Sequence, residues 1–199
     1  MYTRTMPKLW EGTIQAHRRE VRQAIMHGAA ELAAEHGLLS LTMSHIAEQA
    51  GIGRATLYKY FSSVEDILRA WHDQQIEAHL GLLEQARQQA EDSGKQLEAV
   101  LTAYAGILQG TAGHGNELSA FLHSDDQVAR ARARLRAMIV ELIETGIEAG
   151  RLRADVPAGE LAEFCLSALN ASLRLPSQAA ARRLAAVVLA GLRPEALDR

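Results

Sequence analysis

Two short apolar patterns, separated by a turn that contains two glycines, constrain the fold of this chain more than any other feature. The first pattern has the i, i+3, i+4, i+7 spacing of a short amphipathic helix, and its residues are Met43, Ile46, Ala47 and Ala50. Gly51 and Gly53 frame the turn, and the second pattern, RATLYKYF at residues 54–61, places Leu57 and Phe61 on one helical face. Two short helices joined in this way form a helix-turn-helix.

The rest of the chain is also predicted to be helical, so that the fold class is all-α. Hydrophobic residues make up 48% and charged residues 23% of the 199 residues, which is typical of a globular protein. Only four prolines interrupt a sequence rich in residues that favour helix. Further helices are expected at residues 13–36, 63–90, 96–110, 127–149, 158–173 and 177–192.

The charge distribution directs attention to the N-terminal end. The chain has a net charge of -3, which argues against a general polyanion binder. Residues 1–60 contain seven Lys/Arg and five Asp/Glu (+2), whereas residues 61–199 contain fourteen and nineteen (-5). Any nucleic-acid surface is therefore expected in the N-terminal part.

Cysteine content and hydropathy indicate a cytoplasmic protein with no membrane partner. The single cysteine, Cys165, has no partner for an internal disulfide and lies in an apolar helical pattern, where it is interpreted as a small core residue. The longest apolar run, LAAVVLAGL at residues 184–192, is much shorter than the ~20 residues of a membrane span.

The second helix of the helix-turn-helix presents a polar face suited to DNA. Ala55, Thr56 and Lys59, with Tyr60 beside them, lie opposite Leu57 on a helical wheel. A lysine can donate to guanine O6 or N7, and the methyl groups of alanine and threonine can contact a thymine methyl. This face is therefore predicted to enter the major groove.

The segment LTMSHIAEQAGIGRATLYKYFSSVEDIL, residues 41–68, resembles the DNA-binding segment of the TetR family of bacterial transcriptional regulators. The C-terminal stretches GIEAGRLRADVPAGELAEF and LAAVVLAGLRP also resemble TetR-family regulatory domains. The resemblance implies an Ω-shaped homodimer without a cofactor. Residues 1–62 would form an N-terminal arm and a three-helix DNA-binding domain, and residues 63–199 a larger helical bundle for effector binding and dimerisation.

The resemblance also implies DNA-binding roles for individual residues. Thr42 would cap the second helix and meet a phosphate, and Ser44 would face the groove. The recognition-helix and phosphate-binding positions correspond to Arg54, Ala55, Thr56, Tyr58, Lys59 and Tyr60. Gly53 and Val64 depart from the family pattern, which commonly has a capping serine and a lysine there. Packing is the alternative role for the tyrosines, above all for Tyr58, which lies nearer the apolar face.

The C-terminal bundle is expected to bind a hydrophobic or amphipathic small molecule and a second copy of the chain. Candidate ligand-binding residues, which have core packing as their alternative role, are Trp71, Tyr104, Phe121, His123 and Met138. The last two helices are interpreted as a dimer interface, with a buried intrachain pair as the alternative. The interface candidates are Leu161, Phe164, Leu169, Leu184, Val187 and Val188.

The sequence favours a regulator over an enzyme. The eight histidines show no H-E-x-x-H or clustered metal-ligand spacing, and no G-x-S-x-G motif occurs, so neither catalytic nor metal-binding residues are predicted. The expected function is a ligand-responsive repressor that binds a near-palindromic operator as a homodimer. The alternative is a TetR-like helical dimer that has lost sequence-specific DNA binding and acts as a ligand- or protein-binding module.

Overall fold

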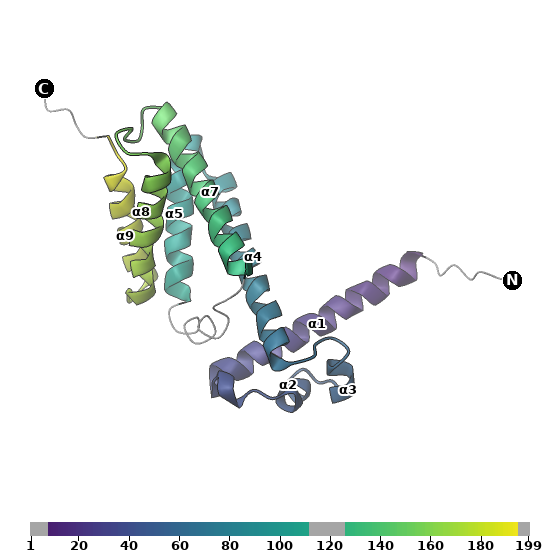
Figure 1. Cartoon of the computed structure of the whole chain (residues 1–199). Helices are drawn as coiled ribbons and strands as arrows, with labels where there is room; N and C mark the ends of the chain where they lie inside the picture. Colours follow the sequence, from purple (N-terminus) through teal and green to yellow (C-terminus); the bar gives the residue numbers. More distant parts are fainter. Residues whose placement is uncertain (1–7, 112–125, 195–199) are drawn as a thin grey trace, which may run out of the picture. The chain divides into compact units, whose positions relative to one another are not determined.

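The computed structural model describes residues 8–111 and 126–194, and every regular element within them is helical (Figure 1), which confirms the all-α prediction. The chain forms two compact units, Met1–Gln74 and Gln75–Arg199. The division falls inside α4 (Val64–Gln89), whereas the sequence predicts a boundary before this helix. The difference arises because the first turns of α4 contribute Ile67 and Trp71 to the packing of the N-terminal unit.

The N-terminal unit contains α1 (Lys8–His36), the 3-10 helix η1 (Leu38–Ser40), α2 (Met43–Gln49), α3 (Arg54–Leu57) and the beginning of α4. Its helices share one hydrophobic core, to which α1, both helices of the helix-turn-helix and α4 contribute. The buried residues of this core are Ile25, Met26, Ala29, Ile46, Ala47, Leu57, Phe61 and Ile67.

Local signals position the helix-turn-helix. Gly37 follows α1 with φ 79°, and Gly51 follows α2 with φ 66°, a region in which glycine avoids the strain of a side chain. The Thr42 hydroxyl oxygen accepts a hydrogen bond from the His45 backbone N–H at 3.2 Å, which confirms the expected N-cap of α2. Residues that the sequence identifies therefore determine where α1 ends and where α2 begins and ends.

The recognition helix is shorter than expected. The sequence predicts a helix over residues 54–61, but α3 ends at Leu57 and residues 58–60 form a turn. Lys59 N–H donates to the Thr56 carbonyl and Tyr60 N–H to the Leu57 carbonyl, at 3.0 and 2.9 Å. These i→i−3 bonds tighten the backbone and end the α-helical geometry.

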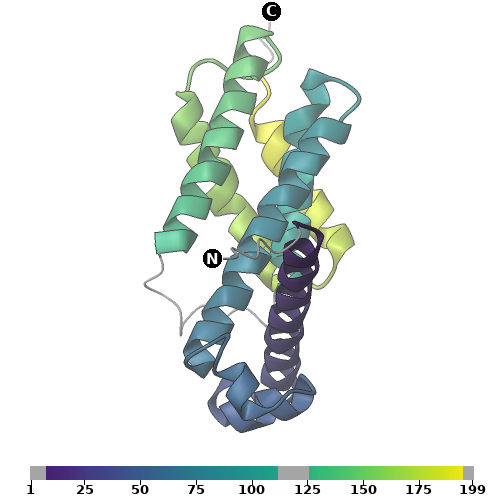
Figure 2. The ribbon, with the colours of Figure 1, turned by 90° about the vertical axis from the view of Figure 1, so that its right-hand side faces the viewer.

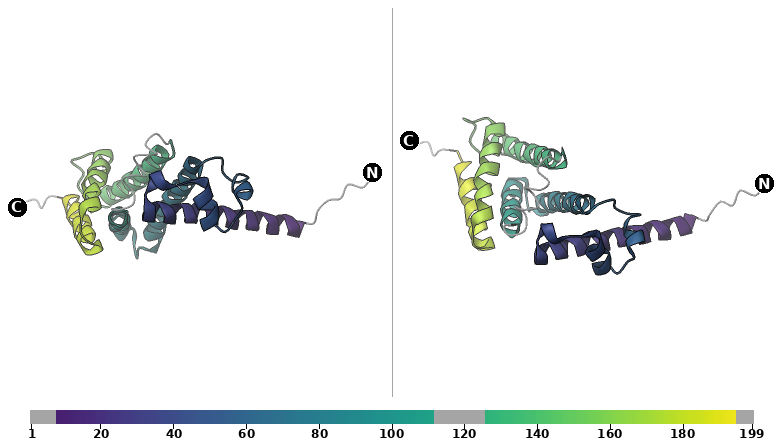
Figure 3. Two further views of the ribbon diagram at one scale, coloured as in Figure 1. Left: turned by 90° about the horizontal axis from the view of Figure 1, so that it is seen from below. Right: turned by 60° about the horizontal axis from the view of Figure 1, so that its bottom comes forward.

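The C-terminal unit is a helical bundle (Figures 1 and 2) in which the later part of α4 is joined by α5 (Ser93–Gly110), α7 (Asp126–Glu148), α8 (Ala158–Leu169), the 3-10 helix η2 (Asn170–Arg174) and α9 (Gln178–Gly191). Helices α8 and α9 lie side by side and both pack against α5 (Figure 3). Cys165 of α8 is buried, and this burial raises the pKa of its thiol to about 12. The thiol therefore packs as a small apolar group at neutral pH.

Two kinds of feature are absent from the part of the chain that the structure describes. No helix there is both long enough and apolar enough to cross a membrane. Residues 8–111 and 126–194 also contain no cluster of three or more histidine, cysteine, aspartate or glutamate side chains arranged to hold a metal ion.

Candidate functional site

The recognition segment, defined here as residues 54–60, is attached to the N-terminal core by apolar side chains. Leu57 is fully buried within the segment, and Phe61, which directly follows it, is 5% exposed. Arg54, Ala55 and Lys59 are exposed on the surface of the segment, while Thr56 is half-buried. The structure therefore combines a buried anchor with an exposed polar surface in one short segment.

The N-terminus of α2 contributes two further exposed side chains, Thr42 and Ser44. While the Thr42 hydroxyl oxygen accepts from His45 N–H, its own hydrogen is available to donate, as a hydroxyl can do both at once. A phosphate oxygen is a suitable acceptor for such a donor. Thr42 can thus cap the helix and contact DNA with the same oxygen atom.

The exposure of the two tyrosines is the reverse of what a regular helical wheel gives. Tyr58, which a regular helix would bring nearer the apolar face, is 50% exposed. Tyr60 is half-buried and packs against the N-terminal core. The turn after Leu57 changes the directions of both side chains, so the packing role considered for Tyr58 falls to Tyr60.

The start of α4 is held by two serines that follow the recognition segment. Ser63 Oγ accepts from the Asp66 backbone N–H at 3.1 Å, as the S-x-x-D pattern indicates. Ser62 Oγ donates to the Asp66 carboxylate. The pKa of Asp66 is lowered below its ordinary value mainly by the hydrogen bond with Ser62, and secondly by the hydrogen bond with Ser63. The carboxylate therefore stays charged at the positive end of the helix dipole.

These features define a class: a DNA-binding protein of the helix-turn-helix type with a second, larger helical unit. Residues 25–71 match the family model described as bacterial regulatory proteins, tetR family. Residues 95–194 match the model described as transcriptional regulator SbtR-like, C-terminal domain, which covers half of the chain. The chain belongs to the TetR family of bacterial transcriptional regulators.

Individual relatives agree with this assignment. The fatty acid metabolism regulator protein of Bacillus subtilis (strain 168) is 26% identical over 141 residues, which are 70% of each chain. A TetR/AcrR-family regulator from Thermobifida fusca YX-ER1 shares the fold with a TM-score of 0.74 at 20% identity, over 87% of this chain and 99% of the other. FadR from Bacillus subtilis, solved in complex with stearoyl-CoA, aligns with a TM-score of 0.66 at 17% identity, over 86% and 99%.

Family membership identifies the class to which this protein belongs. The protein is a DNA-binding transcriptional regulator that responds to a ligand, and it is not an enzyme. The recognition segment and α2 are therefore the elements to examine for DNA contacts, and the C-terminal unit is the part to examine for an effector site.

One hollow in the C-terminal unit lies between α4 and α7 and has a volume of about 360 Å³. It is lined by Leu80, Glu84, Arg134, Ala137, Met138 and Glu141. Of the predicted ligand-binding residues that the structure describes, Met138 lines it, whereas Tyr104 and Trp71 do not. Tyr104 packs half-buried against the bundle core, and Trp71 packs against the core of the N-terminal unit. Phe121 and His123 lie outside the described residues.

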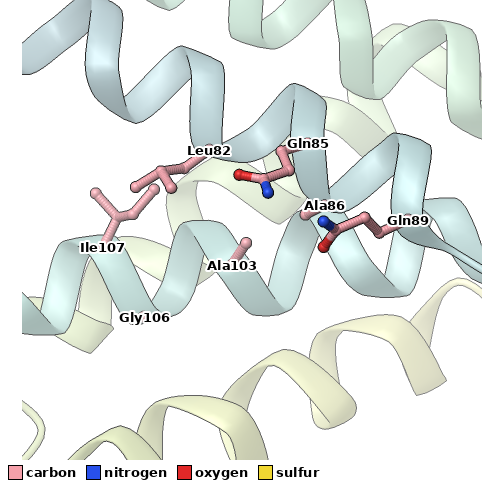
Figure 4. Close-up of a pocket in the computed structure, with 7 residues that line it drawn as sticks. All are labelled: Leu82, Gln85, Ala86, Gln89, Ala103, Gly106 and Ile107. Atoms are coloured by element: carbon pink, nitrogen blue, oxygen red, sulfur yellow. The ribbon is translucent and has the colours of Figure 1, made fainter.

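A second, more open groove lies between α4 and α5 and has a volume of about 400 Å³ (Figure 4). Its lining residues, none of which the sequence analysis identified, are Leu82, Gln85, Ala86, Gln89, Ala103, Gly106 and Ile107. The four that belong to α4 occur at i, i+3, i+4 and i+7, so they share one face of the helix. The sequence signal that was missed is Leu82, the leucine with which this pattern begins and which the structure leaves exposed.

Two ion pairs connect α4 to α7. Arg87 donates to both carboxylate oxygens of Glu141 at 2.6 and 3.2 Å, and Arg134 contacts both oxygens of Glu77 at 2.8 and 3.1 Å. The hydrogen bond and positive charge of Arg87 hold the pKa of Glu141 below its ordinary value. Glu141 and Arg134 also line the α4–α7 hollow, so both pairs reach its rim.

The candidate interface residues divide into two groups. Leu161, Leu169 and Val188 are buried in the core of their own chain, so they have almost no surface left for a partner. This burial corresponds to the intrachain alternative. Phe164 is 47% exposed and Val187 is 68% exposed, while Leu184 is half-buried. The apolar surface of α8 and α9 that is open to a partner is therefore narrower than the sequence suggested.

The Arg87–Glu141 pair gives a pH-dependent prediction. A carboxylate with a lowered pKa in the folded state stabilises the protein above its unfolded-state pKa, and the contribution is lost as the pH falls through the folded-state pKa. We expect Glu141→Gln to lower the free energy of unfolding at pH 7 by about 0.5 kcal/mol, because the Glu141 side chain is exposed to solvent. Urea unfolding of the parent and the variant measures this difference in the free energy of unfolding at pH 7 and at a series of pH values below the ordinary glutamate pKa of 4.5. The difference should disappear in acid.

Glu144→Gln is the matched control, because Glu144 is exposed on the same helix and no cation pairs with it among the described residues. The interpretation of the pair would be contradicted by equal effects of the two substitutions at pH 7.

Proposed function

We propose that this protein is a ligand-responsive repressor that binds a near-palindromic operator as a homodimer and leaves it when a small molecule binds. Two copies of one helix-turn-helix match two half-sites about one helical turn apart, because a twofold dimer mirrors a twofold operator. The observation that carries the proposal is the exposed polar surface of the recognition segment next to its fully buried Leu57.

The DNA-binding surface consists of Thr42, Ser44, Arg54, Ala55, Thr56, Tyr58, Lys59 and Tyr60. Lys59 is exposed and can donate to a guanine in the major groove. Tyr58 is half exposed and suited to donate to a phosphate, which sets orientation rather than sequence preference. Tyr60 has less accessible surface, so its contribution is smaller than that of Tyr58.

Lys59→Ala and Tyr58→Phe should separate base reading from phosphate contact. Operators are first selected from fragments of the source genome with the purified protein. We expect Lys59→Ala to lose about 1–3 kcal/mol of discrimination at a single base position, because one base contact disappears. Tyr58→Phe should weaken all sequences alike, since phosphates are the same at every step.

Competition binding with operators that carry single base changes measures both effects. Unchanged base preference in Lys59→Ala would contradict the proposed docking. Binding by the parent protein that is weak, blind to sequence and abolished at moderate salt would instead favour the alternative function as a ligand- or protein-binding module.

The proposed effector is hydrophobic or amphipathic. Support comes from the α4–α7 hollow, where Leu80, Ala137 and Met138 supply apolar surface and charged groups lie at the rim. Its volume of about 360 Å³ falls within the range of small-molecule pockets. A relative named for fatty acid metabolism and a structural neighbour solved with stearoyl-CoA make acyl thioesters the first class to test.

Met138→Trp should weaken the response to such an effector. The larger side chain fills the hollow without changing the recognition segment, so operator affinity without ligand should remain that of the parent. Fluorescence anisotropy of the operator during titration with stearoyl-CoA, coenzyme A and stearate measures release. One of these probes should release the parent protein from its operator. For that probe, we expect Met138→Trp to raise the concentration required for release at least about tenfold, which corresponds to a loss of about 1.4 kcal/mol or more in binding free energy. A parent-like response would place the effector elsewhere.

The proposed dimer surface is the exposed apolar part of α8 and α9, namely Phe164, Leu184 and Val187. Val187→Arg places a charge on this surface and is expected to shift the protein toward monomer, because an unpaired charge is costly to bury. Sedimentation equilibrium measures the shift. Arg182→Glu, at an exposed position of α9 about 140° away from Val187, is the control and should leave the dimer intact.

A further inference from the structure

The part of the recognition segment that follows α3 has little backbone support of its own. Helix α3 has only four residues, and its N-cap, Gly53, supplies no side-chain hydrogen bond. Beyond it, backbone bonds connect Lys59 to Thr56 and both Tyr60 and Phe61 to Leu57. A single turn of helix is unstable in isolation, because nucleation costs more than its few bonds return. The exposed tyrosine and lysine therefore depend on their neighbours for a defined position.

Two apolar side chains hold this turn at its ends. Leu57 precedes Tyr58 and is fully buried, and Phe61 follows Tyr60 and is 5% exposed. Both belong to the core that also contains residues of α1, α2 and α4. Any contact that restrains the Phe61 ring consequently restrains the backbone of residues 58–60.

Arg22 of α1 makes such a contact. Its guanidinium carbon lies over the Phe61 ring, 4.3 Å from the ring centre. This distance is within the ~6 Å range in which a cation is attracted to the face of an aromatic ring. Arg22 is itself exposed and forms no ion pair among the described residues. The contact connects α1 directly to the residue that ends the recognition segment.

We propose that Arg22 is a positioning residue for DNA reading, which acts by holding Phe61 and through it the turn that presents Tyr58 and Lys59. This inference rests on the proposed operator binding. Arg22 acts through the ring rather than through a phosphate, so its loss should reduce specific binding without changing the number of cations that contact DNA. Nonspecific binding, which depends on backbone charge alone, should remain at the parent level.

The test uses the full-length protein with Arg22→Met, which retains a long side chain but removes the cation. Arg19→Met is the matched control, because Arg19 is an exposed cation on the same helix for which the described residues include no aromatic ring contact. Operator and scrambled DNA are titrated at several salt concentrations. We expect Arg22→Met to lose about two- to fivefold in operator affinity, the range of an exposed cation–π contact, and Arg19→Met to keep the parental specificity ratio.

Phe61→Leu supplies a double-mutant cycle. Removal of the ring should cause a similar loss of specificity, and Arg22→Met should add nothing further in the Phe61→Leu background. Additive losses from the two substitutions would overturn the proposal. So would a decrease of about 0.9 in the slope of log affinity against log salt for Arg22→Met, because that change marks a lost phosphate contact.

Amide hydrogen exchange on the protein without DNA tests positioning independently of operator binding. In Arg22→Met, the amides of Lys59, Tyr60 and Phe61 should exchange about two- to fivefold faster, while those of α2 stay at the parental rate. Unchanged exchange would overturn the inference whatever the DNA results. Faster exchange in a protein whose parent form selects no operator would support the positioning role and contradict the proposed function instead.

Discussion

Burial of Leu57 is the constraint on which the N-terminal unit depends. This side chain is the last residue of α3 and packs into the core that α1, α2 and α4 share, with Ile25 and Ile46 fully buried in the same cluster. Complete burial of a leucine stabilises by about 1.5–3 kcal/mol, far more than the few backbone bonds of one helical turn contribute. The exposed surface of α3 is consequently an outcome of core packing: the residues proposed to contact DNA are those that the buried side chain leaves outside.

The helices and their ends could largely be read from the sequence, because local rules determine them. Apolar periodicity predicted the long helices, and Gly37, Gly51 and Thr42 occupy the end positions that their backbone freedom and hydrogen bonding favour. The recognition helix was less predictable. Its period continues to Phe61, but the backbone changes to a turn after Leu57, and this change exposes Tyr58 and half-buries Tyr60. A wheel drawn at a constant angle cannot describe such a change.

Tertiary neighbours explain the other differences in the C-terminal unit. A leucine at helical spacing looks the same whether it faces its own bundle or a partner, so the sequence did not separate buried Leu161 and Leu169 from exposed Val187. Likewise, Arg87 and Glu141 are 54 positions apart, and only the packing of α4 against α7 brings them together. Of the effector candidates, Met138 lines a hollow because its neighbours on α4 leave space there, which no pattern along one helix records.

The buried thiol of Cys165 makes this chain convenient for site-directed labelling. It is the only cysteine in the protein, it has no exposed surface, and its pKa of about 12 keeps it protonated at the pH of maleimide or methanethiosulfonate reactions. A cysteine introduced at an exposed position will therefore react alone, without replacement of the native residue. Spin labels or fluorophores can be attached to the wild-type background, so that separations between the two subunits of the proposed dimer can be followed with and without DNA.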